Sequence, residues 1–268
     1  MPFTISHTAV VLPFSRLLAR RRLLSATVIG AMVPDFRLFF PGVPRVETHS
    51  AIALLTFCLP VGLITYWLFE RLIKTPLVQL LPEGPYARWR PYAAEGDIRS
   101  VRQWLLAAFG ILMGAVSHIV WDGFTHEGGR GVRMFPALDD SIFDIGRRHV
   151  PGIYLLQDLG SLLGIAAVLG MVCYALRHGG QAPVPNRLMR RAERIEWIRI
   201  YVIAAVVLSV AFYVWPRIGQ ATMHSIVGRV SDVAIASLRG LAAALLSVSL
   251  ALQVRLRALR HLSSGPER

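Results

Sequence analysis

Long apolar runs separated by basic, proline-containing segments dominate the chain. Five runs have about the 20 residues that a membrane-crossing helix needs. They cover residues 51–69, 104–121, 153–176, 198–215 and about 233–254. This pattern predicts an all-α fold, a polytopic transmembrane helix bundle.

Two shorter apolar runs come before these spans. Residues 3–18 and 23–33 flank the basic stretch Arg20–Arg22. Both are short for full spans, so they predict an N-terminal helical hairpin of tilted or partial spans with the arginines at its tip. The second arm should stop at Pro34–Asp35, because proline disfavours the helical conformation in the residue before it. The predicted fold therefore has about five full spans plus this hairpin.

Composition supports a membrane protein and excludes several other classes. The 268 residues are 54% hydrophobic and 17% charged, with a mean hydropathy of +0.51. The net charge of +13 could indicate a nucleic-acid partner, but the basic residues cluster between apolar runs rather than along one face, so no nucleic acid is expected. Cys58 and Cys173 each lie inside an apolar run, which argues against disulfides and zinc–thiolate motifs.

The basic residues also predict the orientation of the chain. If the hairpin crosses the membrane, most Lys and Arg residues fall in one set of loops, which includes residues 70–103, 177–199 and the C-terminal tail. The positive-inside rule places this set, and hence the C-terminus, in the cytoplasm. Residues 70–103 are expected to form a basic connector on the membrane surface.

Ionisable residues at the end of the 104–121 span carry the main functional signal. His118 and Asp122 are four residues apart, so on a helix both side chains can reach one point, a spacing typical of metal ligands. His126 lies a further four residues on, roughly 12 Å from His118, too far for one ion to take all three easily. Asp122 would pair with one histidine while the other orients it, or bridge two ions. The alternative is a hydrogen-bonded pair that only fixes helix packing.

The predicted topology gathers further ionisable residues on the same side of the membrane, opposite the cytoplasm. They are His7, Asp35, His49, His118 and Asp122, with Asp158 near the start of the next span. This convergence predicts one site near the non-cytoplasmic face. We therefore expect residues 1–176 to form a metal-site helical membrane core, residues 177–197 a basic linker, and residues 198–268 the C-terminal transmembrane helices.

Four stretches resemble a known family. Residues 1–9, 30–36, 48–50 and 117–126 look like the bacterial membrane family catalogued as domain of unknown function 4184, and the resemblance covers most of the chain. That family is similar to inner-membrane metal-dependent hydrolases. The resemblance implies a multi-pass protein of the bacterial inner (cytoplasmic) membrane. It implies a metal-ligand set of His7, Asp35, His49, His118 and Asp122.

Imidazole and carboxylate ligands suit zinc, or manganese or iron where carboxylates dominate. Such an ion lowers the pKa of a bound water to about 7. Asp35, Asp122 or Glu47 could accept its proton, while His126, Asp158 and Glu47 are possible further ligands or hydrogen-bond partners of ligands. The location predicts hydrolysis of a membrane lipid or a lipid-linked ester or phosphoester. A non-catalytic scaffold with a structural metal, or a cation or proton transporter, stays open as an alternative, as does the oligomeric state.

Overall fold

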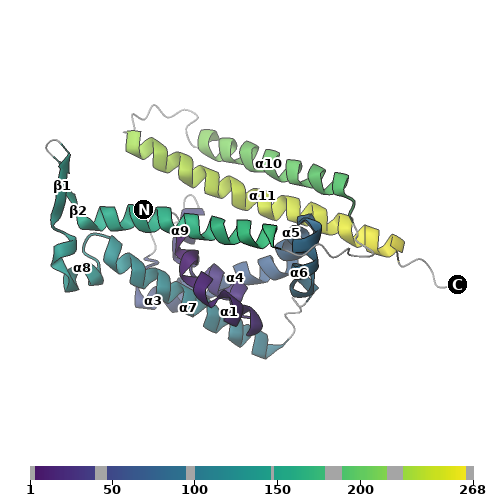
Figure 1. Ribbon diagram of the computed structural model, residues 1–268, viewed down its shortest axis with the longest axis horizontal. Helices are drawn as coiled ribbons and strands as arrows, with labels where there is room; N and C mark the ends of the chain where they lie inside the picture. Colours follow the sequence, from purple (N-terminus) through teal and green to yellow (C-terminus); the bar gives the residue numbers. More distant parts are fainter. Residues whose placement is uncertain are drawn as a thin grey trace. The chain divides into compact units, whose positions relative to one another are not determined.

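The computed structural model describes residues 4–39, 47–94, 100–145, 148–178, 189–215 and 226–263. Within these residues, five helices are long and apolar enough to cross a membrane (Figure 1). They cover Ala51–Leu80, Val101–Thr125, Gly152–Arg177, Arg191–Val214 and Asp232–Arg260. The predicted all-α transmembrane bundle is therefore confirmed, and the strands described are confined to one short hairpin.

Internal contacts divide the chain into two compact units. The first consists of Met1–Tyr66 and Ile98–Ala175, and the second of Trp67–Asp97 and Leu176–Arg268. All the candidate metal ligands are in the first unit. The functional division at residues 177–197 stays a prediction, and residues 179–188 of that linker lie outside the described residues.

The N-terminal hairpin is present, with arms that mix two kinds of helix. The first arm consists of the 3₁₀ segment η1 (Thr4–Phe14) and α1 (Ser15–Arg20), and the second of α2 (Leu24–Gly30) and the 3₁₀ segment η2 (Val33–Phe39). Arg22 between the arms has a φ of 59°, a left-handed conformation that tightens the turn. The second arm continues past Pro34 as 3₁₀ helix instead of ending there. Buried side chains joining the arms are Val11, Leu18, Leu23 and Ala31.

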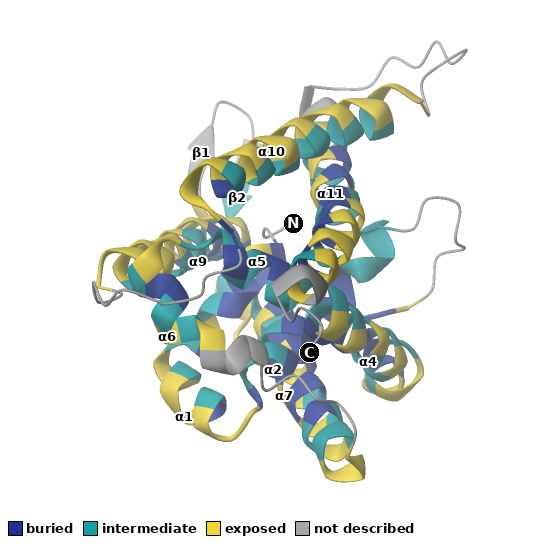
Figure 2. Cartoon of the chain, turned by 90° about the vertical axis from the view of Figure 1, so that its right-hand side faces the viewer, coloured by how far each residue is buried: buried dark blue, intermediate teal, exposed yellow. Residues whose placement is uncertain are grey.

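The second arm packs closely against α7 (Val101–Thr125). A Cβ atom added at Gly114 of α7 would lie 2.5 Å from the backbone nitrogen of Ala31 and 2.8 Å from the carbonyl carbon of Gly30. Small residues let membrane helices approach to backbone contact, and Gly114 does so here. Figure 2 shows buried positions on α7 and α2. Gly114 and Gly30 are among the buried residues of these two helices. The end of α2 is thereby held beside the turn of α7 that carries His118.

The helix that begins at Ala51 extends well past the predicted end of its span. It comprises α3 (Ala51–Ala53), α4 (Leu59–Leu68) and α5 (Lys74–Leu80), joined by two π-helical segments. These segments are η3 (Leu54–Cys58) and η4 (Phe69–Ile73).

The π segments explain how this helix contains two prolines. Proline has no N–H to bond the carbonyl four residues earlier and clashes with it. For Pro60 and Pro76, that earlier residue lies in η3 or η4, where carbonyls bond five residues ahead. The expectation that residues 70–103 form a loop is wrong over most of the described part of this stretch, which is helical. The stretch contains η4, α5 and α6 (Glu83–Ala94). Lys74 Nζ, at the start of α5, lies 2.8 Å from Glu70 Oε2 in η4.

The connection between α7 and α9 (Gly152–Arg177) is partly ordered as regular structure. It contains α8 (Arg130–Met134) and a 3₁₀ turn, Pro136–Leu138. An antiparallel hairpin of β1 (Ser141–Ile145) and β2 (Arg148–Pro151) follows. This segment follows the end of α7, the part of the helix that carries His118 and Asp122.

In the second unit, α10 (Arg191–Val214) packs along α11 (Ile226–Ser263). The hydroxyls of Tyr201 and Ser249 lie 2.6 Å apart between the two helices. Figure 2 shows α10 as largely exposed outside this contact, as expected for a helix whose surroundings are lipid. Buried side chains of this unit include Met189, Leu252 and Leu256.

Candidate metal centre

Five ionisable side chains from separate elements of the first unit meet in one place. His7 comes from η1 and Asp35 from η2, whereas His49 precedes α3. His118 and Asp122 face the same point from successive turns of α7. The five are the set that the family resemblance implies, and the hairpin supplies two of them.

Two histidines and two carboxylates form the densest part of the cluster. The Nε2 atom of His49 lies 3.2 Å from Asp122 Oδ2 and 3.6 Å from Asp35 Oδ1. The Nε2 atom of His118 lies 3.2 Å and 3.7 Å from the same two oxygens. Each ring nitrogen therefore lies between two carboxylate groups that come from different segments.

These separations match those of ligands that share one metal ion. In a tetrahedral zinc site with bonds of about 2.0–2.2 Å, neighbouring donor atoms lie about 3.3–3.6 Å apart. The four distances of 3.2–3.7 Å fall close to this range. Two carboxylates also balance the charge of one divalent cation, which matters where water is scarce. The donor set therefore fits a divalent ion such as zinc in both geometry and charge.

A backbone carbonyl selects the tautomer of the neutral His118 ring. Its Nδ1 atom lies 2.8 Å from the carbonyl oxygen of Ala31, just past the end of α2. Because a carbonyl can only accept a hydrogen bond, Nδ1 carries the proton in the neutral ring. The lone pair is then on Nε2, the atom that faces the carboxylates. Metal-binding histidines are held in their binding tautomer by contacts of this kind.

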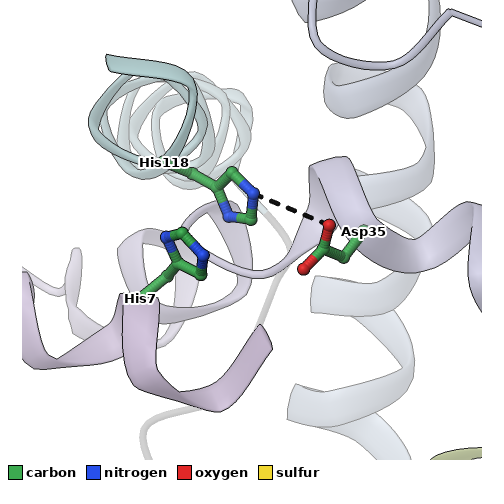
Figure 3. Close-up of side chains that lie close together, drawn as sticks. All are labelled: His7, Asp35 and His118. Carbon is green, nitrogen blue, oxygen red and sulfur yellow. Dashed lines mark ion pairs between the residues drawn. The ribbon is translucent and has the colours of Figure 1, made fainter. Parts of the chain in front are cut away.

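His7 lies against His118 and adds a further nitrogen. The two rings are stacked, with centroids 3.7 Å apart and an interplanar angle of 16°. Figure 3 shows the His7 and His118 rings side by side and Asp35 across from them, with a dashed line between His118 Nε2 and Asp35 Oδ1, which form an ion pair only when His118 is protonated. The Nε2 atom of His7 is 3.6 Å from Asp122 Oδ1. The side chains of His7 and His118 are 2% and 0% exposed, so water does not surround these nitrogens.

Three buried atoms of the cluster lack a hydrogen bond to any described residue: His7 Nε2, His118 Nε2 and Asp122 Oδ1. An unsatisfied buried polar atom costs roughly 1–3 kcal/mol. Such atoms are rare in folded proteins, and here three of them lie within one cluster. A cation held among them would satisfy all three.

Neighbouring side chains orient the other ligands. The Thr4 hydroxyl donates to Asp35 Oδ2 at 2.7 Å, which leaves Oδ1 facing the histidines. His49 Nδ1 lies 2.9 Å from the Thr48 hydroxyl. The backbone N–H of His49 donates to Glu47 Oε1 at 2.9 Å. Each contact fixes a ligand on the side away from the cluster, as second-layer partners do in metal sites.

The carboxylates hold a proton on His49 when no metal is bound. Burial lowers the pKa of His49, but hydrogen bonds to Asp122 and Asp35 outweigh this effect and raise the pKa to about 9. Burial alone would raise the pKa of Asp35, whereas its hydrogen bonds with His49 and Thr4 bring it below the usual value. In the metal-free protein at neutral pH, His49 is therefore a cation beside ionised carboxylates. A divalent ion would replace that proton.

The other predicted site residues take different positions. The helix ends at Thr125, and His126 departs from it with an extended backbone, its Nδ1 atom 3.7 Å from Asp122 Oδ1. Glu47 is exposed and contacts the site through the backbone of His49. Two groups of potential ligands have donor atoms close enough to share an ion: His7, Asp35 and His118, and His49, His118 and Asp122. Asp158 is exposed on α9 and belongs to neither group.

Sequence reasoning missed three contributors: Thr4, Thr48 and the Ala31 carbonyl. Thr48 is next to His49, and Thr4 lies in the same motif as His7, so their hydroxyls could have been considered. No sequence signal identifies the Ala31 carbonyl, because any residue type supplies one.

The cluster is open on one side. The side chains of His49 and His126 are 36% and 42% exposed, in contrast to the closed faces of His7 and His118. Structural metal sites are typically closed by protein ligands, whereas His49 in this cluster is partly exposed. The arrangement can hold a cation, present it to a small group arriving from outside, and accept a proton on a carboxylate.

No curated protein and no solved structure matches the chain. A family model described as a domain of unknown function, number 4184, matches residues 1–250. The matched region contains the hairpin, all five clustered residues and most of the described helices, so the chain belongs to this family.

Proposed function

We propose that this protein is a metal-dependent hydrolase of the bacterial inner membrane that cleaves an ester or phosphoester bond in a lipid or lipid-linked substrate. His7, Asp35, His49, His118 and Asp122 would hold a divalent cation, zinc in the first instance and manganese or iron as alternatives. The observation that carries the proposal is the group of buried atoms on His7, His118 and Asp122 that face one another without making a hydrogen bond within the part of the chain that the structure describes.

Burial and charge support metal binding over a simple ion-pair cluster. A hydrogen-bonded cluster would be expected to satisfy its buried atoms, yet three of them make no hydrogen bond to any described residue. With Nδ1 donating to the Ala31 carbonyl, the neutral His118 ring presents a lone pair on Nε2, the form that binds a cation.

The open side supports catalysis over a structural role. A bound divalent cation would supply Lewis acidity and activate water near neutral pH. Asp35 and Asp122 are placed to accept a proton from a water at the cluster, since each has an oxygen facing the histidines. Exposed His49 marks the side from which a substrate would arrive.

The substrate class follows from location. His118 and Asp122 lie in the last turns of a helix able to cross a membrane, so the cluster is near a membrane surface. The resemblance of the family to inner-membrane metal-dependent hydrolases points the same way. The predicted topology places this surface on the non-cytoplasmic side, with the C-terminus in the cytoplasm.

The first experiment measures metal in protein purified in detergent. Wild type should hold about one divalent ion per chain, and Asp122→Asn should hold far less. Asp158→Asn is the matched control, because this exposed aspartate lies outside both potential ligand groups. Equal metal content in wild type and Asp122→Asn would refute metal binding at this site.

The second experiment tests the reaction. Purified protein is incubated with a panel of phospholipids and lipid-linked phosphoesters, with and without a chelator. Cleavage should disappear on chelation, return when zinc or manganese is added, and be absent in His118→Ala. Full metal occupancy without cleavage of any panel member would favour the structural-site alternative, in which the ion ties the hairpin to α7.

A further inference from the structure

The segment that joins α7 to α9 carries large apolar side chains on its surface, although it lies outside the spanning helices. Met134, Phe135 and Ile142 are 72%, 55% and 57% exposed. All residues from Arg133 to Ala137 are exposed. Soluble surfaces tolerate isolated apolar side chains, but several exposed together beside two membrane spans indicate contact with a membrane or another protein.

This segment starts and ends at one membrane surface. Helices α7 and α9 are consecutive and each is able to cross the bilayer, so the residues between them emerge on the same side. The bilayer boundary is therefore within reach of α8 and the β hairpin.

The segment is fixed rigidly to the end of α7. The rings of Phe124 on α7 and Phe135 have centroids 6.2 Å apart. A Cβ atom at Gly131 of α8 would overlap the Phe124 ring, so α8 sits directly on the last turns of α7. The start of β1 lies against the start of α9, since a Cβ atom at Gly152 would lie 3.0 Å from Ile142 Cδ1. The exposed side chains thus belong to a segment that packs against α7 and α9.

Basic side chains beside these apolar residues indicate that a phospholipid surface covers them. Arg130 and Arg133 are exposed on α8, within one helical turn of Met134. Basic residues beside exposed apolar residues are typical of segments that lie in the boundary between headgroups and acyl chains, where the cations meet phosphate. Tyr154, exposed at the start of α9 and hydrogen-bonded to Glu127, is an amphipathic residue of the kind enriched at that depth.

We infer that α8 and the turn after it insert Met134 and Phe135 into the boundary between the phospholipid headgroups and the acyl chains, with Ile142 at the edge of the contact. The occupant of this surface is the bilayer in which the protein is embedded. This inference does not depend on the proposed chemistry. Since α8 sits on the turns of α7 that carry Asp122, immersion would bring the open side of the cluster to the lipid surface.

The test uses spin labels on full-length protein in vesicles of phosphatidylcholine and phosphatidylglycerol. Phe135→Cys and Met134→Cys are made in a Cys58→Ser, Cys173→Ser background and labelled. Asp139→Cys is the control, because Asp139 is exposed a few residues away and polar. Accessibility is measured to oxygen, which concentrates in lipid, and to a water-soluble nickel chelate.

Labels at 134 and 135 should be several-fold more accessible to oxygen than to the nickel chelate, and the label at 139 should show the reverse. Nickel accessibility at 134 and 135 equal to that at 139 would overturn the inference. Protection from both probes would also overturn it, since it would mean that a protein covers this surface. To exclude an effect of the label, Phe135→Trp should show a larger fraction of fluorescence quenched by brominated phospholipids than Asp139→Trp.

Discussion

His118 holds its Nδ1 atom 2.8 Å from the carbonyl oxygen of Ala31, 87 positions earlier in the chain. This contact joins the N-terminal hairpin to α7 and leaves the Nε2 lone pair of His118 facing two carboxylates. It exists because the helices are in backbone contact one turn away, at Gly114. Helix packing thus determines the chemistry of a candidate ligand.

The first prediction concerns this packing. Gly114→Leu should weaken metal binding by at least tenfold although no ligand changes, because the added side chain forces α2 and Ala31 away from His118. It should also lower the midpoint of thermal unfolding in detergent. Gly170→Leu is the control, since nothing lies within 4 Å of a Cβ atom at Gly170. Metal titration of both variants measures their affinities, and wild-type affinity in Gly114→Leu would contradict the prediction.

A second prediction tests how Asp35 is oriented. Thr4→Val keeps the side-chain shape but removes the hydroxyl that donates to Asp35 Oδ2. Loss of a second-layer partner typically weakens metal binding about 10–100-fold. Thr65→Val is the matched control, because the Thr65 hydroxyl bonds the carbonyl of Val61 within its own helix. Competition with a chelating dye measures both affinities; a decrease of equal size in the two variants would show that Thr4 has no special role.

Metal binding should depend on pH through His49. The pKa of His49 is raised to about 9 without metal, so an ion must displace a proton at neutral pH. Affinity should therefore rise with pH by up to about tenfold per unit and level off above pH 9. Calorimetry in buffers of different ionisation enthalpy should detect proton release close to one per ion at pH 7. His49→Gln should release fewer protons, and an unchanged value would refute the assignment.

The folding stability of the metal-free protein should also depend on pH through the titration of His49. The folded pKa of His49 lies above its unfolded value of 6.5, so protonation favours the folded state. This stabilisation is fully present below pH 6.5 and is lost as the pH rises to about 9. The unfolding temperature of the metal-free wild type should therefore fall across this range relative to His49→Gln. Parallel curves for the two proteins would show that His49 does not titrate in this way.

The second unit offers a prediction that separates folding from metal binding. A Cβ atom at Gly240 of α11 would lie 2.5 Å from the Cα atom of Ser209 on α10. Gly240→Leu should therefore separate these helices and lower the unfolding temperature. Metal content should stay at the wild-type level, because every candidate ligand is in the first unit. Loss of metal in Gly240→Leu would show that the two units depend on each other.

The apolar pattern was sufficient to predict the spans. A helix in a bilayer must satisfy its own backbone hydrogen bonds and present apolar side chains, so length and hydropathy identify it. The apolar pattern did not predict helix beyond the end of an apolar run. The stretch from Glu70 to Ala94 looked like a basic loop with prolines, yet most of it is helical. The π segment at Phe69–Ile73 accommodates Pro76 there, and such a segment has no recognisable pattern in sequence.

The sequence by itself determined which residues could form a site. His118 and Asp122 share a helix face by spacing, and the order of spans placed His7, Asp35 and His49 on the same side. Only the tertiary structure decided that these side chains meet within ligand distance, that Asp158 lies outside the cluster, and that Ala31 fixes the His118 ring. Spacing along one helix is fixed by local geometry, whereas distances between segments depend on how closely the helices pack. Here that depends on contacts such as the one at Gly114, whose partners are far away in the chain.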